Sequence, residues 1–84
     1  EIPTSELNSV IRDAIMRQPP HSRKGRQLKI YYCTQVQSGP PTFLLFVNEP
    51  ALMHFSYSRY LENTLRETFG FHGTPIEIKL RKRS

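Results

Sequence analysis

The sequence predicts one α+β domain in which two helices pack on one face of a three-stranded mixed sheet. Two segments of about fifteen residues place apolar side chains at helical spacing. Three shorter segments alternate apolar and polar residues or are rich in β-branched and aromatic ones. The expected order is helix, strand, strand, short helix, helix, strand. Because 84 residues provide one hydrophobic core, residues 1–84 are expected to form a single domain.

Residues 4–18 form the first predicted helix. Thr4 or Ser5 is expected to cap its N-terminus, and Pro19-Pro20 ends it, because proline cannot continue a helix. The apolar residues follow the i, i+3, i+4 pattern of a helix with one buried face: Leu7, Val10, Ile11, Ala14 and Ile15.

Residues 28–37 and 42–48 are two predicted strands, joined as an antiparallel hairpin by a turn at residues 38–41. In the first strand, alternation places Leu28, Ile30 and Tyr32 on one face, opposite Tyr31 and Cys33. The second strand is apolar on both faces, because Leu44 and Phe46 alternate with Phe43, Leu45 and Val47. One of these faces is either covered within the chain or docks on something outside it.

The remaining elements are a turn or short helix at residues 49–55, a second long helix at residues 56–69 and a third strand at residues 75–83. Ser56 is the expected cap of the helix. A right-handed crossover makes the third strand parallel to the second if the two are neighbours. The expected inward stripe of the second helix is Tyr57, Tyr60, Leu61, Thr64, Leu65 and Thr68.

Gly70-Phe71-His72-Gly73 resembles the Gly-x-x-Gly with which KH domains hold single-stranded nucleic acid. In a KH domain, however, that motif lies between two helices, and here the corresponding junction, residues 53–56, has no glycine. Gly70 is better explained as the left-handed residue that ends the second helix, and Gly73 as a turn residue. We therefore expect no functional Gly-x-x-Gly clamp.

The composition favours a polyanionic partner. The net charge is +5 and the isoelectric point is near 9.8, which suits RNA or DNA, although a basic face can also serve solubility alone. Cys33 is the single cysteine, which fits a reducing compartment such as the cytoplasm. The histidines and Cys33 lack metal-ligand spacing, and no run of about 18 apolar residues predicts a membrane span.

Two basic clusters are the candidate RNA contacts. Arginine and lysine neutralise phosphates, and an arginine can also stack on an unpaired base, whereas the alternative is a solvated surface. Tyr31 is a candidate for base stacking or for a partly wet protein interface. The clusters comprise Arg17, His21, Arg23, Lys24, Arg26 and Lys29 in the first, and Lys79, Arg81, Lys82 and Arg83 in the second.

Several motifs, in the same order, make this chain similar to the C-terminal KH-like domain of the bacterial tandem-GTPase family Der, also called EngA. They are the helix-ending Pro-Pro, the Gln-x-x-x-x-Pro-Pro hairpin turn, the Phe-Val-Asn strand end, Ser-Tyr-x-Arg-Tyr-Leu-Glu-Asn in the second helix and Gly-Thr-Pro-Ile before the last strand. The resemblance covers essentially all 84 residues. It implies a KH-like fold of type II order.

The resemblance also implies a function. The chain would be a fragment of a longer protein whose two GTPase domains bind GTP and Mg²⁺ and act in biogenesis of the large (50S) ribosomal subunit. This chain has no Gly-x-x-x-x-Gly-Lys-[Ser/Thr], so it is expected to have no cofactor and no enzymatic activity of its own.

Two hypotheses for this chain remain open, and both describe a monomer. In the first, the domain contacts rRNA through Arg17, Arg23, Lys24, Arg26, Lys29, Lys79 and Arg81. In the second, it docks on the GTPase domains through Leu44, Phe46 and Tyr31 and regulates them without touching RNA.

Overall fold

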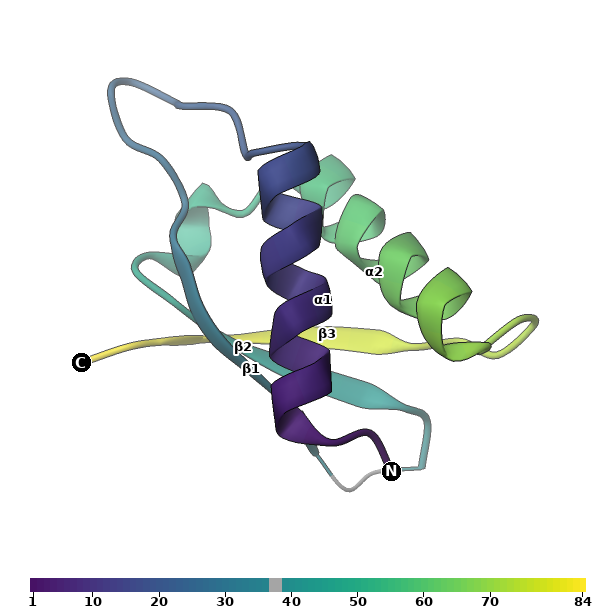
Figure 1. The fold of residues 1–84 in the computed structure, drawn as a ribbon. Coiled ribbons are helices and arrows are strands. Elements are labelled where there is room, and N and C mark those ends of the chain that lie inside the picture. The colour runs from purple at the N-terminus through teal and green to yellow at the C-terminus, as the bar shows by residue number, and fades with distance from the viewer. Residues whose placement is uncertain (37–38) are drawn as a thin grey trace.

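A computed structural model describes residues 1–36 and 39–84 and confirms the α+β fold with two helices and a three-stranded mixed sheet. Both helices cover the same face of the sheet (Figure 1). Gln37 and Ser38, predicted at the end of the first strand and the start of the turn, lie outside the described residues. The elements are α1 (Thr4–Arg17), β1 (Ile30–Val36), β2 (Thr42–Val47), the short 3₁₀ helix η1 (Pro50–Leu52), α2 (Phe55–Phe69) and β3 (Glu77–Lys82).

The sheet has the order β1-β2-β3, so β2 is its central strand. Pairing of β1 with β2 is antiparallel and pairing of β2 with β3 is parallel, which confirms both strand predictions. Phe43, Leu45 and Val47 of β2 are fully buried in the core beneath the helices. Leu44 and Phe46 alternate with them and are half-buried on the face turned away from the helices, which we call the open face.

A β-bulge in β1 overturns the predicted division of its side chains between the two faces. Ile30 pairs with Val47 and Tyr32 pairs with Phe46, so one extra residue, Tyr31, stands between them. An extra residue in one strand shifts the alternation after it. Cys33 therefore lies in the core, fully buried, whereas Tyr32 is on the open face and 45% exposed.

A buried asparagine attaches α1 to the outer edge of β1. Asn8 receives the Cys33 backbone N–H at 2.8 Å and donates to the Cys33 carbonyl at 2.8 Å. Its side chain thus takes the place of a neighbouring strand at the edge of the sheet. The apolar stripe predicted the buried Leu7, Ile11 and Ala14 correctly but did not include Asn8.

The predicted N-terminal caps were wrong for both helices. Helix α1 follows Pro3 and has no side-chain cap. Helix α2 begins at Phe55, and its cap is His54, whose Nδ1 accepts the Ser56 backbone N–H at 3.1 Å.

The predicted inward stripe of α2 was wrong at its end. Thr68 is exposed, because the buried stripe continues in steps of four from Tyr57 through Leu61 and Leu65 to Phe69.

The glycines after α2 have the predicted structural roles. Gly70 has a left-handed φ of 77° and ends α2, with its N–H bonded to the Arg66 carbonyl at 3.0 Å. Gly73 has a φ of 73° in the turn that leads to β3. Phe71, between them, packs its ring on Phe43 of the core with centroids 6.0 Å apart. This segment is helix-end and turn structure, as expected.

Candidate nucleic-acid interface

The first basic cluster contains a tight turn that the sequence did not predict in detail. Arg23 and Arg26 exchange two backbone hydrogen bonds, of 2.7 Å and 2.9 Å. Between them, Lys24 has a φ of 53° and Gly25 a φ of 75°. Positive φ at both central residues is what the two-residue I′ hairpin turn requires. We call residues 23–26 the basic turn.

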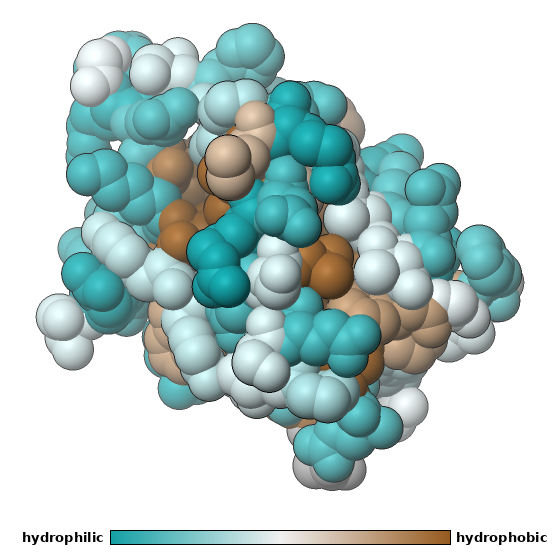
Figure 2. Space-filling view, in the orientation of Figure 1, coloured by the Kyte–Doolittle hydropathy of each residue, from teal (hydrophilic) through white to brown (hydrophobic). Residues whose placement is uncertain are grey.

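The basic turn is exposed, and its charges are not neutralised by neighbouring carboxylates. Within residues 1–36 and 39–84, the ion pairs are Arg66 with Glu62 and Lys82 with Glu49, neither of which includes the turn. Figure 2 shows hydrophilic residues over the protruding loop at the upper left, with apolar atoms in the recess beside it. The loop therefore presents a free, concentrated positive charge to solvent.

Hydrogen bonds fix the base of this loop to the body of the domain. The Gln27 side chain donates to the Pro20 carbonyl at 2.6 Å. Asn48, which follows β2, accepts the Lys29 N–H at 2.8 Å and donates to the Gln27 carbonyl at 3.1 Å. Leu28 is buried in the core between them. No pattern in the sequence predicted this role for Asn48, although the residue ends the Phe-Val-Asn motif.

A half-open groove of about 450 Å³ lies between this loop and the start of α2. Tyr57, which lines the groove, donates to the Gln18 carbonyl at 2.9 Å, and Tyr60, one turn further along, donates to the Ala14 carbonyl at 2.6 Å. These two bonds tie α2 to the end of α1 beside the groove. Burial, and secondarily the neighbouring Tyr60, raises the pKa of Tyr57 to about 12, so this hydroxyl remains a donor. The groove is lined by Gln18, Pro19, Pro20, His21, Arg23, Leu52, His54, Ser56 and Tyr57.

This groove occupies the junction where a KH domain has its Gly-x-x-Gly, residues 53–56. His54 and Ser56 line it, and both were missed as site residues. The sequence shows a basic loop and, some thirty residues later, the start of a helix, but no pattern in it predicts that these two segments lie side by side.

Two members of the second basic cluster, Lys79 and Arg81, lie on the open face, among the apolar residues predicted to dock. Lys79 pairs with Leu44, and Arg81 pairs with Phe46, in the β2–β3 register. Tyr32 of β1 completes this face, with its ring centroid 6.1 Å from that of Phe46. Two sets of residues that the sequence assigned to different surfaces therefore share one surface. Tyr32 was missed because alternation placed it on the opposite side.

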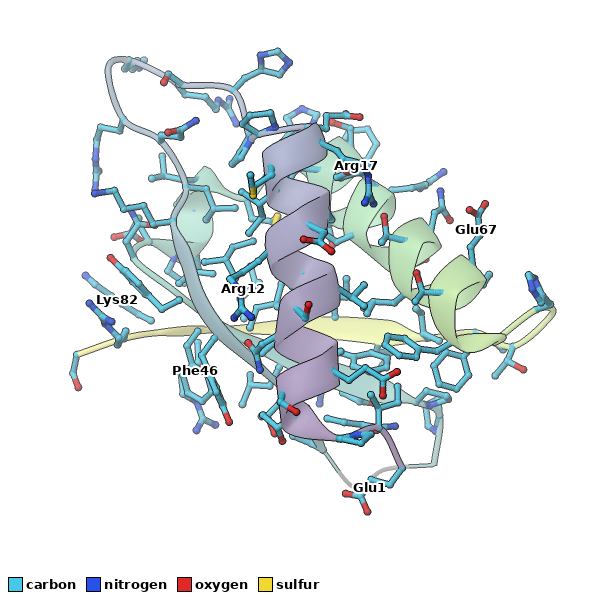
Figure 3. All side chains as sticks on the ribbon, viewed as in Figure 1. Glu1, Arg12, Arg17, Phe46, Glu67 and Lys82 are labelled. Atoms are coloured by element: carbon cyan, nitrogen blue, oxygen red, sulfur yellow. The ribbon has the colours of Figure 1, made fainter. Side chains whose placement is uncertain are left out.

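The remaining predicted residues lie apart from both groups. Arg83 places its guanidinium 3.5 Å from the centre of the Tyr31 ring, a cation–π contact beside the bulge. Arg17 projects from the end of α1 toward α2, on the side away from the loop (Figure 3). Lys82 pairs with Val47 in the β2–β3 register and contacts Glu49 at 3.5 Å. The candidate RNA contacts thus fall into three places: the basic turn with Lys29, the open face, and Arg17.

The described residues offer little other chemistry. They contain no group of three or more His, Cys, Asp or Glu side chains arranged to hold a metal ion, and no helix among them is long and apolar enough to cross a membrane. Burial raises the pKa of Cys33 to about 12, so its thiol stays protonated and is a poor nucleophile.

Comparison with known proteins identifies the family of this domain. The model of the "KH-domain-like of EngA bacterial GTPase enzymes, C-terminal" matches residues 1–81. GTPase Der of Desulforamulus reducens is 58% identical over 82 residues, and GTPase Der of Brevibacillus brevis is 57% identical over 83, covering 98% and 99% of this chain. GTPase Der of Natranaerobius thermophilus is 61% identical over 77 residues, 92% of the chain.

The chain spans about a fifth of the length of these relatives, 18–19% of each. A family model that covers nearly the whole chain, and relatives well above half identical along it, agree with the fold described above. The chain therefore belongs to the KH-domain-like family found at the C-terminus of EngA (Der) bacterial GTPases.

Proposed function

We propose that this chain is a non-catalytic RNA-binding and regulatory domain of a GTPase needed for biogenesis of the large (50S) ribosomal subunit, and that it contacts rRNA through its basic surface. The supporting observation is the basic turn: Arg23, Lys24 and Arg26 protrude together and have no carboxylate partner among residues 1–36 and 39–84. Cations fixed in this way release counterions from phosphates on binding. Lys29, at the base of the loop, adds a further positive charge near these three residues.

The relatives are GTPases, named GTPase Der, which supports a GTPase as the parent polypeptide. In this proposal GTP and Mg²⁺ are bound by the parent's GTPase domains, outside this chain. The domain is a cytoplasmic monomer that docks on those GTPase domains through Leu44 and Phe46 of the open face and through Tyr31 at the neighbouring bulge. This docking regulates access to RNA.

The RNA contact is tested by amide chemical-shift mapping of the 84-residue chain with short single-stranded and hairpin RNAs, at about 50 and about 200 mM salt. Shifts should cluster at residues 17–29, and the affinity should fall about tenfold or more between the two salt concentrations. Arg23→Glu and Lys24→Glu should each weaken binding about fivefold, uniformly across RNA sequences.

Arg59→Glu, an exposed change on α2, is the control with the same change in charge. If Arg23→Glu and Lys24→Glu bind RNA as well as the wild type does, or if no shifts appear at low salt, the RNA proposal fails.

A second candidate is a purely intramolecular protein-interaction module without RNA contact. Its support is the half-buried Leu44 and Phe46 on the open face, beside the exposed Tyr32. In the full-length GTPase, Phe46→Asp should then change the rate of GTP hydrolysis while the domain stays folded. An unchanged rate in a folded variant would exclude docking through this residue.

A further inference from the structure

The basic turn combines two features that are unfavourable in the free protein. Lys24 has a positive φ, a backbone conformation that is strained for a residue with a Cβ and relaxed for glycine. Arg23 and Arg26 form a hydrogen-bonded pair, so their side chains leave the same face of the ribbon about 5.5 Å apart at the Cα atoms. Like charges directly opposite each other repel. Gly or Asn at position 24 and a neutral residue in the pair would remove both costs.

An anion placed between the two arginines turns the repulsion into an attraction. Each guanidinium presents a planar fork of donors that matches the oxygens of a phosphate, and two forks on one side of a rigid ribbon can hold one phosphodiester from two directions. The turn fixes the backbone beforehand, so less ordering remains to be done on binding. Lys24, between the two arginines in the turn, adds a third positive charge to the same loop.

Arg23 also lines the groove between the loop and α2, so the phosphate site opens directly onto it. The volume of the groove, about 450 Å³, lies within the range of small-ligand sites. Pro19 and Pro20 supply apolar contact, whereas His54 and Ser56 supply polar groups that can meet the edge of a base. A base can enter such a groove only when it is unpaired and unstacked.

We propose that the basic turn and this groove form a subsite for one nucleotide of single-stranded RNA, with the phosphate between Arg23 and Arg26 and the unpaired base in the groove. This inference rests on the proposed RNA-binding function and adds to it a preference for single strands and a dependence on the shape of the turn. It assigns a role to His54 and Ser56 in place of the missing Gly-x-x-Gly.

The phosphate half is tested by fluorescence anisotropy of a labelled oligouridylate with the 84-residue chain across a salt series. Gly25→Val keeps every charge but disfavours the positive φ, and should weaken binding about fivefold because the turn must be ordered on binding. The double change Arg23→Gln with Arg26→Gln should lower the slope of log affinity against log salt by about 0.7 for each phosphate that is no longer neutralised. Arg12→Gln with Arg59→Gln removes the same charge elsewhere on the surface and is the control.

The base half is tested with a blunt RNA duplex of the same length and with Ser56→Trp, which fills the groove from an exposed position. The single strand should bind about tenfold more tightly than the duplex, and Ser56→Trp should reduce that preference without changing the salt slope. Asn63→Trp, at an exposed position two turns along α2 and outside the groove, is the matched control. Circular dichroism melts establish that each variant is folded.

The outcomes separate this inference from the proposed function. The phosphate clamp is overturned if Gly25→Val binds RNA as tightly as the wild type does and if both double variants, the one in the turn and the control, weaken binding equally. The proposed RNA binding would not be contradicted by that result. Equal affinity for duplex and single strand, unaffected by Ser56→Trp, overturns the base site. A wild-type chain that binds neither RNA at low salt removes the proposed function itself.

Discussion

At the scale of single residues, Cys33 shows how a position in the sheet determines the chemistry of a side chain. The bulge at Tyr31 turns the thiol into the core, where burial raises its pKa from an ordinary value of 9.0 to about 12. In the native state the thiol therefore keeps its proton up to a higher pH than it does in the unfolded chain. Stability that depends on a raised acid pKa is present below the unfolded pKa and is lost as the pH rises above it.

We therefore expect the free energy of unfolding to fall between pH 8 and pH 10, with Cys33 contributing about 1 kcal/mol of that loss. Tyr57, whose pKa is also raised to about 12, adds a smaller part near the upper end. Urea denaturation of the wild type and of Cys33→Ala at both pH values measures this. The variant should lose about 1 kcal/mol less over the interval. An identical pH dependence in both proteins would contradict the assigned role of the thiol.

At the scale of elements, the contact between α1 and β1 depends on one polar side chain. The outward N–H and C=O of Cys33 lie on the edge strand beneath α1, where water does not reach them, and Asn8 pairs with both. Asn8→Ala leaves two buried backbone groups without partners, each of which costs about 1–3 kcal/mol. We expect the variant to lose about 2–4 kcal/mol of stability in urea denaturation. Amide exchange at Cys33 should accelerate accordingly.

Asn63→Ala is the comparison for this experiment, because Asn63 is exposed and its side chain accepts a hydrogen bond from the nearby Arg66 side chain at 3.0 Å. Its cost should stay below about 0.5 kcal/mol, as for most surface changes. If the two asparagine variants were equally stable, the strand-like role of Asn8 would be wrong.

The elements also show what the sequence could and could not predict. The helices were predictable because steps of four, such as Leu7 to Ile11, repeat over several turns. The bulge at Tyr31 was not, since a run of β-branched and aromatic residues looks the same with or without one extra residue. For the same reason alternation predicted Leu44 and Phe46 together on one side of their strand but placed Tyr32 wrongly relative to them.

At the scale of the whole molecule, the candidate site is assembled by the fold. The loop after α1 and the start of α2 are some thirty residues apart in the chain, yet Arg23 and His54 line one groove. Composition predicted a basic surface, and the clusters of Arg and Lys were visible as sequence. The basic turn lies next to the junction where a KH domain would carry its Gly-x-x-Gly. This arrangement depends on the hydrogen bonds of Tyr57 and Tyr60 to the end of α1, and no local sequence pattern predicts those bonds.

The central strand β2 has one face buried against the helices and one face, the open face, that is only half-buried. Phe43 is fully buried, and Phe43→Ala should cost about 3–5 kcal/mol, a large part of the roughly 4–13 kcal/mol expected for a chain of this length. Phe46 lies on the open face, so Phe46→Ala should cost about 1.5 kcal/mol or less. Urea denaturation followed by circular dichroism compares the two at equal protein concentration. Equal destabilisation would assign Phe46 to the core and would leave the open face without spare apolar surface for a partner. A large difference would mean that changes at Phe46 can be used in the full-length GTPase to separate docking from folding.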